Sequence, residues 1–124
     1  MGSKVHFIVS TSCLPHTFMG LHLPKQLTEG LLSSLSILYL HENDLTGPIP
    51  ISIGSLHNLS RFILVDNRLN GSIPEEVGMM RSLVMLDLSM NYLTGPIPAS
   101  LGNLSNLVWL YLYGNNLSGS IPMK

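Results

Sequence analysis

Two short runs in this chain of 124 residues carry side chains that could exchange protons. His41 stands beside Glu42, and Glu75 beside Glu76, which are residue types used in general acid–base catalysis. His41 falls in an expected strand and the two glutamates in an expected convex segment, so we interpret both pairs as solvated surface. The chain has no phosphate-binding glycine loop, dinucleotide-binding glycine motif, zinc-protease motif or Cys-x-x-Cys. We therefore expect no enzymatic activity, no catalytic residue, no metal site and no cofactor.

The composition excludes further classes of function. Six basic and seven acidic residues give a net charge of −1 without a run of either sign, so nucleic acid is not an expected partner. The longest apolar run, residues 108–113, is far shorter than the roughly 20 residues that span a bilayer. With 45% hydrophobic and 10% charged residues, the chain should fold rather than remain disordered. Cys13 is the only cysteine, so no internal disulfide can form.

The elements that must position any binding residues follow a period of 24 residues from about Leu32 onward. The recurring positions are Leu35, Leu59, Leu83 and Leu107; Leu40, Leu64, Leu88 and Leu112; Asn43, Asn67, Asn91 and Asn115; Leu45, Leu69, Leu93 and Leu117; Gly47, Gly71, Gly95 and Gly119; Ile49, Ile73, Ile97 and Ile121; and Pro50, Pro74, Pro98 and Pro122. The predicted units are 32–55, 56–79, 80–103 and an incomplete 104–124. Residues 1–31 break the period and are interpreted as a degenerate N-terminal segment or partial repeat.

Each recurring position has a physical role in a stacked coil. Within residues 108–113, Leu110 and Leu112 alternate with neighbours expected to be exposed, which predicts a half-buried strand. Four such strands should form a short parallel sheet. The asparagine amides should bond backbone groups of their own turn and of the adjacent repeat, forming a ladder. The glycine that precedes Ile-Pro should adopt a conformation that other residues avoid. Gly54, Gly78 and Gly102 are expected to end each convex segment.

The units read L-x-x-L-x-x-L-x-L-x-x-N-x-L-[ST/N]-G-x-I-P and resemble the plant-specific leucine-rich repeat. The distinguishing mark, L-[ST]-G-x-I-P, stands at 45–50, 93–98 and 117–122, and Asn70 replaces Ser or Thr in the second copy. The resemblance implies an α/β-type repeat solenoid. This is a leucine-rich-repeat arc with a short parallel concave β-sheet and an irregular or 3₁₀ convex side.

The concave face is the candidate binding surface. It comprises the residues that alternate with the buried leucines, and these vary between repeats while the scaffold positions do not. Its candidate partner-binding residues are Tyr39, His41, Arg61, Ile63, Asp66, Met85, Asp87, Trp109, Tyr111 and Tyr113. Exposed Trp and Tyr are common interface anchors, and together with Tyr92 the aromatic residues are expected to gather toward the C-terminal end. The alternative is plain surface, in which the aromatic residues pack on one another or a neighbouring repeat covers Trp109.

The resemblance also implies a function. The chain is similar to part of the ectodomain of a plant leucine-rich-repeat receptor-like Ser/Thr kinase, a family that binds peptides, hormones or co-receptors outside the cell. The expected partner is thus a peptide or protein, with the parent anchored in the membrane. The alternative is a stand-alone receptor-like protein or a secreted inhibitor of the polygalacturonase-inhibiting type. In the family a capping segment with two cysteines usually covers the first repeat, so the single Cys13 predicts that this cap is absent. Because the C-terminal repeat is expected to be uncapped as well, the two ends predict a piece of a longer protein or of a truncated gene model.

Four Asn-x-Ser sequons suggest an extracellular or secreted chain, although asparagine and serine are also abundant in the repeat itself. The glycosylation candidates are Asn58, Asn70, Asn103 and Asn116.

Overall fold

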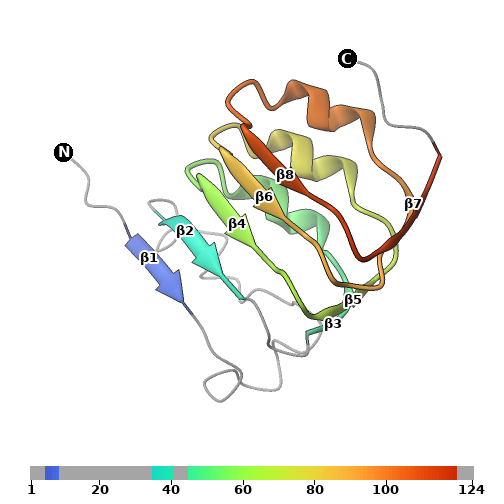
Figure 1. Ribbon diagram of the computed structural model, residues 1–124. Coiled ribbons are helices and arrows are strands. Elements are labelled where there is room, and N and C mark those ends of the chain that lie inside the picture. The colour runs from blue at the N-terminus through green and yellow to red at the C-terminus, as the bar shows by residue number, and fades with distance from the viewer. Residues whose placement is uncertain (1–4, 9–34, 41–44, 120–124) are drawn as a thin grey trace.

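The computed structural model describes residues 5–8, 35–40 and 45–119. In these ranges the chain forms a stack of coils with a parallel sheet on one side and a layer of short 3₁₀ helices on the other (Figure 1). The sheet comprises β1 (Val5–Ile8), β2 (Leu35–Tyr39), β4 (Arg61–Ile63), β6 (Met85–Asp87) and β8 (Trp109–Tyr111), in the order β1-β2-β4-β6-β8. The opposite layer comprises η3 (Ile51–Ser55), η4 (Glu75–Met79) and η5 (Ala99–Asn103). The leucine-rich-repeat solenoid and its 3₁₀ convex side are thereby confirmed.

The register of the sheet repeats the sequence period. Arg61 pairs with Met85, and Met85 with Trp109, so equivalent positions of successive coils lie side by side. Inward-facing leucines from each coil then stack into one core, in which Leu64, Leu69, Leu83 and Leu88 have no exposed surface. The core therefore runs continuously along the stack, as expected for a solenoid in which each unit contacts its neighbours.

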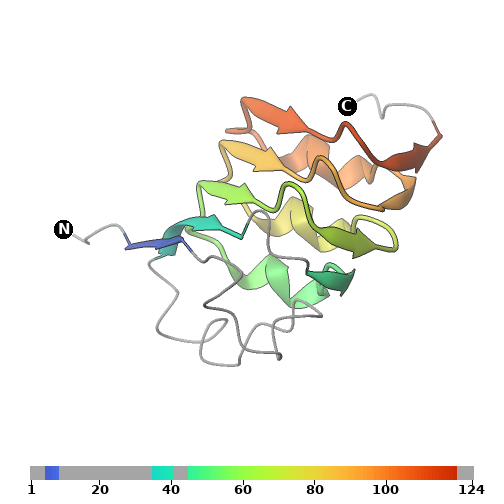
Figure 2. The same cartoon turned by 60° about the horizontal axis from the view of Figure 1, so that its bottom comes forward.

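A second set of short strands lies at the other end of each coil (Figure 2). The strands are β3 (Thr46–Pro48), β5 (Arg68–Asn70), β7 (Thr94–Pro96) and β9 (Asn116–Ser118), paired as β3-β5 and β7-β9. Their residues pair at a spacing of 22, as in Thr46 with Arg68, rather than 24. These strands were not predicted, because their pairing does not follow the period of 24 residues.

The glycine and proline of each L-[ST/N]-G-x-I-P motif act at different points of the coil. Gly71 and Gly95 have φ of 73° and 78°, values that a side chain disfavours, which confirms the predicted role of this column. Pro74 and Pro98 directly precede η4 and η5 with φ of −72° and −68°, so the proline ring presets the backbone for the start of each helix.

Three expectations are wrong in detail. Gly54, Gly78 and Gly102 lie inside η3, η4 and η5 and do not end them, since each helix continues for one more residue. At Gly54 and Gly78 the neighbouring coil approaches so closely that a side chain would not fit. Leu110, expected in the core, is 40% exposed because no described coil packs on its outer side. The sheet has a fifth strand, since β1 pairs in parallel with β2. Phe7 stands 31 residues before its partner Leu38, so the period of 24 could not reveal this pairing.

Candidate functional site

The asparagine ladder holds the strand ends of successive coils together. The Asn91 amide nitrogen donates to the carbonyl oxygens of Leu64, in the preceding coil, and Leu88, in its own coil, both at 3.1 Å. Its Oδ1 accepts the backbone N–H of Leu69 at 3.0 Å. Asn67 and Asn115 make the equivalent bonds one coil earlier and one later. The predicted ladder is thus confirmed in the described coils, and it fixes the point at which each concave strand turns.

One lateral column of the concave face carries Ile37, Arg61, Met85 and Trp109. Arg61 is exposed, Met85 is half-buried, and Trp109 is 46% exposed. The parallel register places these side chains on adjacent strands, at the strand spacing of roughly 4.8 Å. A guanidinium, a thioether and an indole therefore form one continuous strip.

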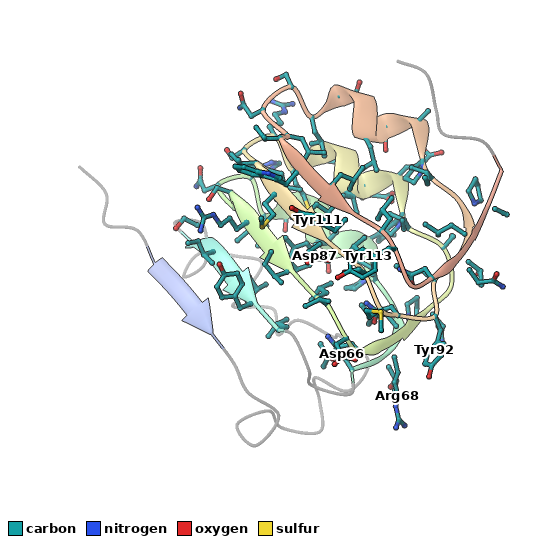
Figure 3. The ribbon with its side chains drawn as sticks, viewed as in Figure 1. Asp66, Arg68, Asp87, Tyr92, Tyr111 and Tyr113 are labelled. Carbon is teal, nitrogen blue, oxygen red and sulfur yellow. The ribbon has the colours of Figure 1, made fainter. Side chains whose placement is uncertain are left out.

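A second column carries Tyr39, Ile63, Asp87 and Tyr111. Asp87 is half-buried and Tyr111 is 37% exposed, and Figure 3 shows both among the side chains of the sheet. Ile63 is only 8% exposed, so its expected role as a contact residue is wrong. Its flanking position between Tyr39 and Asp87 leaves little of it accessible.

A third column, expected to be exposed like the other two, carries Val65, Ser89 and Tyr113 in the described residues. Ser89 was expected to be exposed, yet it is fully buried and donates to Asp87 through both its backbone N–H and its Oγ. Tyr113, one coil later, is 62% exposed. His41 and Glu42 lie outside the described residues. In the sequence they are equivalent to Val65 and Asp66 of the next repeat.

The next position along each coil adopts a left-handed backbone. Asp66 and Met90 have φ of 63° and 59°, and Gly114 has φ of 71°. Both non-glycine side chains are exposed, because this geometry turns the chain away from the sheet. Gly114 was the available signal for this conformation, since glycine tolerates it without strain.

Tyr92 does not join the other aromatic residues. It lies in the turn before β7 and is 64% exposed, and in Figure 3 it points away from Tyr111 and Tyr113. The aromatic group at the C-terminal end of the concave face, among the described residues, therefore consists of Trp109, Tyr111 and Tyr113.

The remaining candidates lie on other surfaces. Asn58, Asn70, Asn103 and Asn116 are all exposed, and none lies in a strand of the concave sheet. Glu75 is exposed and Glu76 half-buried in η4. Within the described ranges, no group of three or more His, Cys, Asp or Glu side chains is placed to hold a metal ion. Over the same residues, no helix has the length and apolar character needed to cross a membrane.

Comparison with known proteins defines the class to which this fold belongs. The Leucine Rich Repeat family model matches residues 34–56, 82–104 and 106–123, which together make up half of the chain. The chain belongs to the leucine-rich-repeat family. A comparison with curated proteins finds no match.

Solved structures that are similar to this chain include plant receptors and a plant ice-binding protein. The chain is similar to the plant peptide hormone receptor RGFR1 in complex with RGF2, with a TM-score of 0.72 and 36% identity over 98% of this chain. It is also similar to the BIR3–SERK2 complex from Arabidopsis thaliana (TM-score 0.75, 44% identity) and to the PEPR1–AtPEP1 complex (TM-score 0.75, 45% identity), each over 81% of this chain. The match covers 16%, 53% and 14% of those three chains, respectively, so this chain spans only part of their length.

Proposed function

We propose that this chain is a non-enzymatic, extracellular recognition module that binds a peptide or protein partner through its concave face. In this proposal it forms part of a plant receptor-like kinase ectodomain and serves signalling. The observation that carries the proposal is the contrast between a constant scaffold and a variable concave surface. That surface presents Trp109, Tyr111 and Tyr113 beside Arg61 and Asp87. Large aromatic residues with an adjacent charge are typical of interface hot spots.

The printed descriptions of the similar structures support the class of partner. One is a peptide hormone receptor in complex with RGF2, and another is the PEPR1–AtPEP1 complex. A third is the complex of BIR3 with SERK2, two proteins. A peptide or a protein co-receptor is therefore the partner class that we propose for this chain.

Selection from a displayed random-peptide library, with the full chain as target, tests this proposal. We expect Trp109→Ala and Tyr111→Ala to weaken the selected peptides at least about tenfold, as for hot-spot aromatics. Both side chains are well exposed, so the fold should remain and the melting temperature should change little. Ile51→Ala in η3 is the matched control, since Ile51 is 67% exposed on the opposite surface. Peptides that lose affinity with Ile51→Ala and keep it with the concave variants would contradict the proposal.

The extracellular location has its own test. All four sequon asparagines are exposed, and attached glycans would leave the concave strands uncovered. Glycopeptide mapping of the protein from its native source should find at least one of them modified. Four unmodified asparagines would remove this support.

The non-enzymatic part of the proposal is tested separately. A phosphotransfer assay on the purified chain should give no signal, and ATP-dependent activity would overturn the non-enzymatic assignment.

A further inference from the structure

Asp87 is a charged side chain of the concave face that hydrogen bonds hold in one orientation. Its Oδ1 accepts two hydrogen bonds from Ser89, one from the backbone N–H at 3.0 Å and one from Oγ. Ser89 is itself fully buried, so these bonds restrict rotation of the carboxylate. In the described part of the chain, no donor or cation reaches the other oxygen, Oδ2. That oxygen is free to accept a charge-assisted hydrogen bond from a ligand.

Aromatic side chains lie on one flank of this carboxylate. Tyr111 is the direct neighbour of Asp87 on the adjacent strand, and Trp109 precedes it by two residues on the same strand. Tyr113 lies one coil beyond Ser89, and Figure 3 shows Asp87, Tyr111 and Tyr113 within one region of the molecule. Aromatic faces attract cations through the ring quadrupole, most strongly for Trp and then Tyr. The arrangement thus combines one fixed negative charge with three exposed rings.

The surrounding charges favour one sign of ligand. On the other flank of Asp87 lies Ile63, which is buried and uncharged. Arg61 belongs to the neighbouring column and forms no ion pair with Asp87 in the described residues. The negative charge of Asp87 is therefore not neutralised by any cationic side chain among the residues that the structure describes.

We propose that Asp87, Trp109, Tyr111 and Tyr113 form a subsite for a basic side chain of the bound peptide, an arginine in preference to a lysine. This inference rests on the proposed peptide-binding function of the concave face and assigns one specificity to it. Arginine fits better because its planar guanidinium can bond the carboxylate and stack on an aromatic ring at the same time.

Three short peptides that differ at one position test the subsite. The probes are acetyl-Gly-Gly-X-Gly-Gly-amide with arginine, lysine or glutamine as X, titrated against the full chain, and the lysine peptide should bind more weakly than the arginine peptide. Trp109 is the only tryptophan, so its fluorescence reports binding at this place without a label. We expect the arginine peptide to bind about tenfold more tightly than the glutamine peptide, as a partly exposed ion pair and a cation–π contact together would allow.

Two variants, each of which removes one negative charge, distinguish an effect of the subsite from a general effect of charge. Asp87→Asn keeps an oxygen that can accept both Ser89 bonds, and we expect it to abolish the preference for arginine over glutamine. Glu75→Gln removes one negative charge from exposed η4 and should leave the preference intact. Equal binding of the arginine and glutamine peptides to the unaltered chain, or persistence of the preference in Asp87→Asn, would overturn the inference.

The two proposals fail in different ways. If library peptides lose affinity with Tyr111→Ala but the arginine preference is absent, the concave face binds peptides and only the subsite is wrong. If the selected library peptides bind Trp109→Ala and Tyr111→Ala as tightly as the unaltered chain, the proposed function itself is wrong.

Discussion

At the scale of single residues, this protein separates scaffold and surface within the same strand. Leu86 is fully buried, whereas its neighbours Met85 and Asp87 reach the concave face. The scaffold residues have similar neighbours in every coil, whereas the surface residues have different neighbours in each coil. A substitution therefore acts on stability or on recognition according to its place in the coil.

The asparagine ladder gives the clearest prediction at this scale. Asn91→Ala removes the acceptor of the buried Leu69 N–H and one of the two asparagine donors to each of the Leu64 and Leu88 carbonyls. We expect a loss of about 2 kcal/mol in the free energy of unfolding, because the Leu69 N–H then remains buried without an acceptor. Urea denaturation measures it. Asn116→Ala is the control. Asn116 is exposed and directly follows the ladder residue Asn115, so its replacement should change stability by less than about 0.5 kcal/mol.

A charge at a core position should destabilise the fold far more than the same charge at an exposed position two residues later. Leu88 has no exposed surface, so Leu88→Asp should abolish the cooperative unfolding transition seen by circular dichroism. Met90→Asp is the matched control. Met90 is 48% exposed with φ of 59°, and the preceding coil already has aspartate at the equivalent position, Asp66. A folded Leu88→Asp chain with unchanged melting would contradict the assignment of this column to the core.

At the scale of elements, the 3₁₀ helices stack closely because of their glycines. A Cβ added at Gly78 would lie 2.5 Å from the Ser100 carbonyl oxygen in the next coil. Ser100 also binds this surface, since its Oγ donates to the Glu75 carbonyl at 2.7 Å. The 3₁₀ helices η4 and η5 thus pack so closely at Gly78 that no residue larger than glycine fits there.

Replacement of these glycines should have unequal effects. Gly78→Ala should destabilise the chain by about 2 kcal/mol, because η4 and η5 must separate to admit the methyl group. Gly102→Ala changes the same position of η5, the last 3₁₀ helix in the described chain, and should be neutral or slightly stabilising. Thermal melting compares the two variants, and an equal loss from both would show that close stacking is not the cause.

Sequence alone predicted the elements that depend on the period and missed those that depend on neighbours. The ladder asparagines and the left-handed glycines were predictable because each coil repeats one local environment. The exposure of Leu110 and the burial of Ile63 were not, since both depend on the side chains and coils beside them. The pairing of β1 could not be found because it departs from the period.

The candidate site divides in the same way. Alternation with buried leucines correctly placed Arg61, Trp109, Tyr111 and Tyr113 on the exposed surface. It could not distinguish Ser89, which is fully buried and donates two hydrogen bonds to Asp87. The unit boundaries stay a prediction, because a repeating coil has no physical starting point.

At the scale of the whole molecule, stability should vary along the stack. The backbone N–H groups of Leu40, Leu64 and Leu88 each donate to a carbonyl of the following coil, at 2.8 to 2.9 Å. Leu112 holds the equivalent position in the last described coil, where no described coil follows to accept its proton. Since repeat proteins are stabilised mainly by contacts between neighbours, this coil should open most readily.

Amide hydrogen exchange tests this gradient. In the full chain, the Leu64 and Leu88 amides should exchange slowly, near the limit set by global unfolding, and the Leu112 amide should exchange much faster. Equal protection of Leu88 and Leu112 would contradict an open last coil.

The central claim is that a partner binds the concave face. Hydroxyl-radical footprinting of the chain with and without its tightest selected peptide tests this most directly. We predict reduced oxidation of Met85, Trp109, Tyr111 and Tyr113, with unchanged oxidation of Met79 on η4, which is 51% exposed. Protection of Met79 with unchanged oxidation of the concave residues would contradict the claim.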